Sequence, residues 1–254
     1  MTGLEQLAVV AAGFGAGILT STVGVASLLS FPVLLAVGLP PVVANASNTV
    51  GMMPAGLSGS FGYRRELREH PRVTAVVIAT SMVGSVVGAT LLLALPPAVF
   101  ETVAPWLILG TCVLVGAQPR ISSLLRKRHE GDSAEQRTSM SKTTTVFAVL
   151  TGVYGGYFGA GSGVMMLAVL GFGLDIELRI TNALKTLAVL AANLVAALIF
   201  VFAAHLEWTA VALLAIGSVV GGYVGAHIGR RLPPALFRTL IVAVGVTASV
   251  LMLR

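Results

Sequence analysis

The chain alternates between apolar runs of about 20 residues and short islands of charge, and this pattern limits its fold more than any other feature. A helix needs about 20 apolar residues to cross a hydrocarbon layer of ~30 Å. Because lipid offers the backbone no hydrogen-bond partners, a chain that crosses it repeatedly forms helices or a closed barrel. Barrel strands would give alternating segments of about ten residues, and none is visible. We therefore expect an all-α polytopic membrane protein that is surrounded by a lipid bilayer.

Composition agrees with this expectation and narrows the possible partners. The 254 residues are 56% hydrophobic and only 10% charged, whereas a soluble domain of this size would carry more charge. The net charge of +6 sits in the loops, where orientation in the membrane explains it better than nucleic-acid binding. Cys112 is the one cysteine, which excludes an internal disulfide and a thiolate metal cluster. No set of His, Asp and Glu has metal-ligand spacing, so we expect no metal and no cofactor.

The chain also contains an internal repeat. The segment Asn45-Ala46-Ser47-Asn48-Thr49 returns as Asn182-Ala183-Leu184-Lys185-Thr186, at an offset of 137 residues (182 minus 45). Two further pairs have the same offset: Gly84 with Gly221, and Gly88 with Gly225. In the opening glycine-rich runs the offset is 139 (152 minus 13), and the pairs are Gly13 with Gly152, Gly17 with Gly156, and Gly24 with Gly163. We divide the chain into a first transmembrane repeat (1–117), a basic linker (118–142) and a second transmembrane repeat (143–254).

Each repeat is predicted to contain a broken, hairpin-like helical element and three transmembrane helices. The apolar stretches 4–38 and 143–174 are too long for one crossing at 1.5 Å per residue, and glycine-rich segments interrupt both. We expect the breaks within 15–24 and 155–163. The other helices are expected at 41–62, 73–94 and 98–117 in the first repeat, and at about 178–204, 208–229 and 235–252 in the second.

The basic residues predict how these helices are oriented. Lys and Arg concentrate in cytoplasmic loops. Loop 63–72, the linker and Arg230-Arg231 are rich in them, whereas loops 95–101 and 205–208 have none. Tracing the chain from loop 63–72 puts both termini outside the cytoplasmic membrane and the two repeats upside down relative to each other. Inverted repeats with broken helices are typical of secondary transporters, whose binding site lies near the bilayer midplane.

The candidate substrate-binding residues lie first on the two repeated helices. In the second repeat, polar residues at spacings of four and seven share one helix face, and the first repeat has a matching face. The members are Asn182, Lys185, Thr186 and Asn193, and Asn45, Asn48 and Thr49. The Asn and Thr side chains would either face a solute or hold helices together in lipid, and these interpretations carry equal weight.

Lys185 favours the solute-binding interpretation. A lysine about two turns inside a membrane helix costs some 2.5–3.5 kcal/mol on insertion scales, so such a residue usually has a function. The alternative is that its side chain reaches the cytoplasmic surface, because Arg179 is only six residues away.

The two breaks supply the other candidates. A helix that starts again after a break presents free amides and the positive end of its dipole, which together favour an anion. Glycines would let a solute approach the backbone and hydroxyls would add donors; these residues are Thr20, Ser21, Thr22 and Gly24, and Gly161, Ser162 and Gly163. The alternative, that glycines only allow close helix packing, suits Gly84, Gly88, Gly221 and Gly225 best.

The order and duplication of these motifs resemble the TauE/SafE family of membrane transporters, named for sulfite export. The resemblance rests on the glycine-rich opening, on Phe31-Pro32-Val33-Leu34 with Gly38, on Asn45-Ala46-x-x-Thr49, and on the return of both motifs in the second half. Gly171 departs from the pattern, because it stands where Pro32 would be. The resemblance implies transport of sulfite, organosulfonates or related small anions, driven by a gradient of protons or another ion.

Two other classes of function stay open at this stage. An intramembrane hydrolase could use Ser162 as its nucleophile, but the base would be His205 or His227, which we expect at the membrane edges. A membrane assembly protein without transport activity is the second class, although broken helices and a buried lysine would have no purpose in it.

Overall fold

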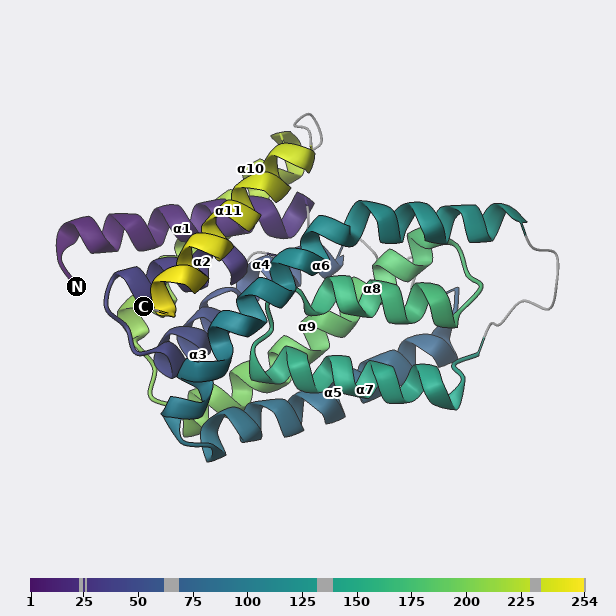
Figure 1. Cartoon of the computed structure of the whole chain (residues 1–254), viewed down its shortest axis with the longest axis horizontal. Helices are drawn as coiled ribbons and strands as arrows, with labels where there is room; N and C mark the ends of the chain where they lie inside the picture. Colours follow the sequence, from purple (N-terminus) through teal and green to yellow (C-terminus); the bar gives the residue numbers. More distant parts are fainter. Residues whose placement is uncertain (23–24, 26, 62–68, 132–138, 229–233, 254) are drawn as a thin grey trace.

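A computed structural model describes residues 1–254 apart from 23–24, 26, 62–68, 132–138, 229–233 and 254. Eleven helices cover the described residues, none of which is in a strand. They are α1 (Gly3–Thr22), α2 (Ser27–Ala36), α3 (Pro41–Gly51), α4 (Met53–Phe61), α5 (Pro71–Ala94), α6 (Pro97–Gly131), α7 (Lys142–Tyr157), α8 (Ser162–Gly173), α9 (Leu178–Ala203), α10 (Trp208–Ile228) and α11 (Pro234–Met252) (Figure 1).

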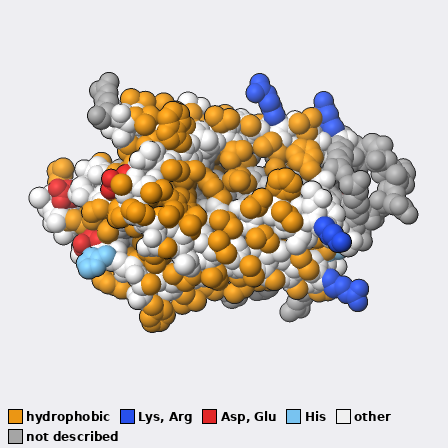
Figure 2. Space-filling view, turned by 60° about the horizontal axis from the view of Figure 1, so that its bottom comes forward, with side chains coloured by type: hydrophobic (Ala, Val, Ile, Leu, Met, Phe, Trp, Pro, Cys, Tyr) orange, Lys and Arg blue, Asp and Glu red, His pale blue; other side chains and the backbone are white. Residues whose placement is uncertain are grey.

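Five of these helices are long and apolar enough to cross a membrane, which agrees with the predicted polytopic class. The spans are Gly3–Thr20, Pro71–Ala94, Pro97–Lys127, Leu178–Ala203 and Trp208–Gly225. Large hydrophobic side chains such as Phe202 and Trp106 are mostly exposed, and orange side chains cover the middle of the face in Figure 2. An exposed apolar surface of this kind suits contact with lipid rather than with water.

Both predicted helix breaks are present. In the first half α1 ends at Thr22 and α2 begins at Ser27, and in the second half α7 ends at Tyr157 and α8 begins at Ser162. The second break turns through Gly159 (φ 81°) and Gly161 (φ 79°), a left-handed conformation that side chains with a Cβ rarely adopt. These two positions therefore require glycine, and the glycine-rich composition of the stretch had predicted a break here.

The single helix predicted over 41–62 is wrong. The structure has two helices there, α3 and α4, which are separated at Met52. Pro54 is the physical reason, because its ring nitrogen cannot donate the hydrogen bond that would continue α3. The matching helix in the second half, α9, has Ala191 at the corresponding position and runs without interruption.

The predicted end of a helix at residue 117 is also wrong. Helix α6 continues through Pro119 to Gly131, so about half of the predicted linker is helical. Leu125 explains the extension, because it is fully buried and its side chain lies against Gly171 of α8. Burial of this leucine stabilises a helix turn that its polar neighbours alone would leave in solvent.

The two halves are interlocked through their glycines. Helix α1 packs along α10, and helix α7 packs along α5. A Cβ placed on Gly17 would meet the backbone of α10 at Ser218, and one placed on Gly156 would meet the backbone of α5 at Ser85. Gly84, Gly88, Gly221 and Gly225 face the opposite helix in the same way, which confirms their packing role. The first helix of each repeat therefore packs against the second-to-last helix of the other repeat.

Helices α6 and α11, the last of each repeat, pack against each other with reciprocal hydrogen bonds. The Ser249 hydroxyl donates to the Pro105 carbonyl (2.9 Å), and the Cys112 thiol donates to the Val242 carbonyl (3.9 Å). These two bonds exchange when the 137-residue offset is applied, because 249 minus 112 and 242 minus 105 both equal 137. The sequence repeat is thus matched by a repeat of contacts.

The two ends of the molecule carry opposite charge. Both termini lie at the left of Figure 1, and the long extension of α6 lies at the right. Figure 2 shows Asp, Glu and His side chains at the left end, and Lys and Arg side chains towards the right. The basic residues on this face therefore lie away from the end that holds the termini.

Candidate functional site

The second helix break forms a compact hairpin tip at residues 158–161. Ser162 opens α8, and its hydroxyl donates to the Gly159 carbonyl (2.8 Å). The amides of Ser162 and Val164 bond to the carbonyls of Gly159 and Gly161 at 3.2 and 2.9 Å. The predicted hydroxyl donor at Ser162 is therefore used inside the tip, and Gly163, the next residue of α8, is buried.

The tip is held from outside by two hydroxyl side chains. Tyr154 of α7 donates to the Ala160 carbonyl (2.8 Å), and Thr111 of α6 lies 3.2 Å from the same oxygen. The two hydroxyls are themselves 2.7 Å apart. The sequence prediction missed both residues, although a tyrosine inside the glycine run 152–156 was a visible signal.

Aromatic side chains pack around the tip from three directions. Phe158 stands edge-on to Phe31 of α2 (5.6 Å between ring centroids) and to Tyr154 (6.2 Å). Phe100 of α6 packs against Tyr157 (5.6 Å). Phe31, Phe100 and Phe158 are buried, so they close the space beside the tip against water.

The polar residues of α3 are engaged in holding other elements. The Asn45 side-chain amide donates to the Tyr157 carbonyl at the end of α7 (2.9 Å). Ser30 of α2 donates to the Asn48 side-chain oxygen (2.5 Å), and both residues are buried. Thr49 donates to the carbonyl of Asn45 in its own helix (2.9 Å). The predicted first-repeat face thus joins α3 to both hairpins, and the bond from Ser30 occupies the Asn48 side-chain oxygen.

The matching face of α9 is different, because Lys185 replaces Asn48. Ser30, the partner of Asn48, corresponds to Val169 of α8 at the 139-residue offset (169 minus 30). Valine offers no acceptor, and in the described part of the chain the Lys185 ammonium has no hydrogen-bond or ion-pair partner. The lysine is only partly exposed and lies seven residues past Leu178, about 10 Å along the helix at 1.5 Å per residue.

Asn193 lies further along α9, beside the hairpin tip. Its side-chain oxygen is 3.8 Å from the point that a Cβ on Gly159 would occupy. The adjacent Ala192 accepts a hydrogen bond from Ser85 of α5 (2.6 Å), which fixes this turn of α9. Asn193 is partly exposed and makes no hydrogen bond within the described residues. The structure therefore brings one predicted residue of α9 to the predicted break.

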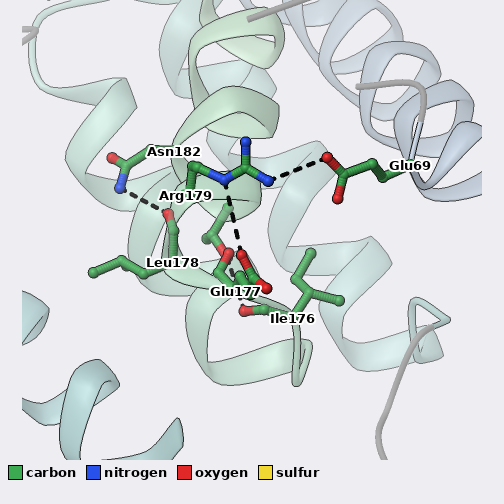
Figure 3. A network of polar contacts seen from close by, with 7 residues as sticks. Glu69, Ile176, Glu177, Leu178, Arg179 and Asn182 are labelled. Atoms are coloured by element: carbon green, nitrogen blue, oxygen red, sulfur yellow. Dashed lines mark hydrogen bonds and ion pairs between the residues drawn. The ribbon is translucent and has the colours of Figure 1, made fainter. Parts of the chain in front are cut away.

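Asn182 and Thr186 lie nearer the start of α9 and are bonded within it. Asn182 donates to the Leu178 carbonyl (2.9 Å), and Thr186 donates to the Asn182 carbonyl (2.8 Å). Figure 3 shows Asn182 beside an ion pair of Arg179 with Glu69 (3.2 Å). These side chains are about half exposed, so the ion pair lies at the surface.

The first break contributes less to the described site. Thr20 donates to the Ala16 carbonyl of its own helix (2.9 Å). Gly24 and the side chains of Ser21 and Thr22 lie outside the described residues.

Ser162 has no base in contact with it among the described residues, because its hydroxyl donates to a main-chain carbonyl. The hydrolase hypothesis needs the opposite arrangement, in which the serine donates to a histidine. His205 lies exposed in the connection after α9.

Comparison with known proteins places the chain among transporters. A sequence profile described as sulfite exporter TauE/SafE matches residues 9–252. A probable membrane transporter protein of Haemophilus influenzae is 25% identical over 94% of this chain and 91% of its own length. Another, ORF9 of a Sinorhizobium species, is 24% identical over 95% and 90% of the two chains, and YfcA of Escherichia coli K12 is 24% identical over 92% and 84%. No solved structure matches.

Proposed function

The chain belongs to the sulfite exporter TauE/SafE family of membrane transporters, and on that premise we propose that it carries sulfite, an organosulfonate or a related small anion. The family name supports the solute class. The observation that carries the proposal within the chain is the Lys185 ammonium, which has no hydrogen-bond or ion-pair partner among the described residues. An unpaired cation inside a membrane protein is costly unless it meets an anion during function.

The solute path that we propose runs along α9. Lys185 comes first from the α8–α9 end, and Asn193 with the hairpin tip lies eight residues, about 12 Å, further on. Lys185 supplies the fixed charge, while the Asn193 side-chain amide supplies hydrogen-bond donors. The two stations are too far apart for one small anion to contact both at once, so the solute passes from one to the other.

The division of labour between the repeats follows from their partners. Asn45 and Asn48 of α3 have bonds to the α7 end and to α2, whereas the side chains of Lys185 and Asn193 have no bond to any residue that the structure describes. In this proposal α3 positions the hairpins and α9 binds the solute. Asn182 and Thr186 then act on the lysine only by shaping the helix face around it.

Transport by alternating access between inverted repeats is part of the proposal. The packing of α1 on α10 and of α7 on α5, across the two halves, supports alternating access. The reciprocal hydrogen bonds between α6 and α11 support it as well. We further propose that the end with basic residues faces the cytoplasm and that an ion gradient, such as that of protons, drives the flux.

A binding screen on the purified chain tests the solute class. Thermal shift is measured with sulfite, sulfate, thiosulfate, sulfoacetate, taurine and simple carboxylates. We expect a sulfur oxyanion or a sulfonate to raise the melting temperature of the parent protein, with a much smaller rise for Lys185→Ala. Stabilisation by carboxylates alone, or an equal shift in both proteins, would contradict the proposal.

A further inference from the structure

The carbonyl of Ala160, at the centre of the hairpin tip, is the most heavily contacted polar atom of the break. It accepts from Tyr154 (2.8 Å) and lies 3.2 Å from the Thr111 hydroxyl. Thr111 also lies 2.8 Å from the Leu107 carbonyl of α6. Each hydroxyl can donate one proton. The two protons are therefore shared among the Ala160 carbonyl, the Leu107 carbonyl and the contact between the two hydroxyls. The result is one connected unit that joins α6, α7 and the tip.

These hydroxyls support the tip beside two glycines, in addition to the hydrogen bonds within the tip. Ala160 lies between Gly159 and Gly161, both at positive φ, and glycine is the residue with the widest choice of conformation. Thr111 also fills the space beside Gly161, where a Cβ would meet its methyl group. On the opposite side, Asn193 lies next to Gly159. The tip is thus held between α6 and α9.

The two residues that support the second hairpin have counterparts without hydroxyls in the repeat. At the offsets of the repeat, Tyr154 corresponds to Gly15 (154 minus 139) and Thr111 corresponds to Ala248 (111 plus 137). Neither of those residues has a hydroxyl, so the first half cannot form the same unit. The half that carries Lys185 and Asn193 is therefore also the half whose hairpin is tied to α6.

We propose that Tyr154 and Thr111 are positioning residues, which hold the Ala160 carbonyl so that the first turn of α8 stays aligned with Asn193 for the solute. The inference rests on the proposed function, because it assigns these hydroxyls to the same site. Helix α6 is suited to this role, since it supports α8 again at Leu125 and contacts α11 of the other repeat. A fixed second hairpin would keep Gly159 in the same place beside Asn193 in each transport cycle.

The first measurement is sulfite flux into proteoliposomes that contain the full chain, with KM and maximal rate determined separately. The variants are Tyr154→Phe and Thr111→Val, with Thr111→Ser as the conservative replacement. Tyr223→Phe and Thr247→Val are matched controls on exposed helix faces. We expect the first two variants to raise KM at least fivefold with less than a twofold change in maximal rate, and Thr111→Ser and the controls to stay within twofold of the parent.

The second measurement reports on the tip without any transport. A single cysteine is introduced as Ala160→Cys in a Cys112→Ser background, and its reaction with N-ethylmaleimide is followed. Ala160 is buried, so we expect slow labelling, which Tyr154→Phe should accelerate several-fold.

The two measurements separate the inference from the proposed function. If the parent carries no sulfite, the proposed solute is wrong, and the labelling rate alone decides whether the hydroxyls hold the tip. Unchanged labelling in Tyr154→Phe overturns the inference. Faster labelling with an unchanged KM also overturns it, because the hydroxyls would then support the fold without positioning the site.

Discussion

At the scale of single residues, the two repeats share a motif but use it differently. Asn48 and Lys185 occupy corresponding positions, yet the asparagine is buried with Ser30 as its partner, and the second repeat has Val169 at the position that corresponds to this serine. The two repeats therefore differ outside the motif as well: α2 has a serine, Ser30, where α8 has a valine, Val169. In the proposed mechanism, one copy of the motif holds the fold together and the other copy binds the solute.

Lys185→Ala should reduce the affinity for the anion severely. A hydrogen bond to a charged group contributes about 1.5–3 kcal/mol, which corresponds to roughly a 10- to 150-fold loss. Lys185→Arg should recover only part, because a planar guanidinium does not replace a compact ammonium. Binding and proteoliposome flux are compared at equal protein, with Asn182→Ala as a control whose amide is bonded within α9. If Lys185→Ala binds and transports like the parent, the lysine only reaches the membrane surface and the site assignment fails.

Ser30→Ala should destabilise the fold rather than the transport step. The substitution removes the donor at 2.5 Å from the Asn48 side-chain oxygen, and both groups are buried. A buried acceptor that loses its partner costs about 1–3 kcal/mol. Thermal unfolding in detergent should show a lower melting temperature, while anion affinity at low temperature stays close to that of the parent. Unchanged stability would mean that Asn48 finds another donor.

At the scale of helices and breaks, the sequence predicted what depends on local composition. Long apolar stretches with glycine-rich centres led to both breaks, because only a break lets such a stretch fit the membrane. The separation of α3 from α4 was missed at Pro54, although proline inside a helix is a local signal. The extension of α6 could not be predicted, because Leu125 is buried by Gly171, which is distant in the sequence. The bonds of Tyr154 and Thr111 to the tip were hidden for the same reason.

Valine substitutions distinguish the glycines of the break from those of the packing faces. Gly161→Val should abolish transport with expression largely kept, because the strain at φ 79° and the contact with the Thr111 side chain are confined to the tip. Gly88→Val should instead remove the protein from the membrane, since its Cβ would meet the Val153 backbone and force α5 away from α7. Membrane content is measured by immunoblot and flux in proteoliposomes. Loss of both proteins from the membrane would show that Gly161 serves packing alone.

At the scale of the whole molecule, the first helix of each repeat packs against a helix of the other repeat. Helix α1 packs on α10 and α7 packs on α5, so neither half buries its first helix by itself. The sequence predicted the repeats and their glycines but not this packing, because the offsets say which residues correspond and not which helices touch. Burial across the halves ties the two repeats into one unit, as a carrier with a site between them requires.

The orientation of that unit in the membrane gives the last prediction. Both termini lie at one end, and the basic residues visible in Figure 2 lie away from it, so the rule that Lys and Arg stay inside predicts termini on the outside. Single cysteines are placed at Gly3, Ser139 and Leu253 in a Cys112→Ser background, and intact cells are treated with a membrane-impermeant maleimide. Gly3→Cys and Leu253→Cys should be labelled from outside, and Ser139→Cys, which is exposed just before α7, only after the cells are opened. Labelling of Ser139→Cys in intact cells, together with protection of both termini, would reverse the orientation. Labelling of only one terminus would contradict the inverted repeats themselves. Each inverted repeat crosses the membrane an odd number of times, so the two ends of the chain must lie on the same side.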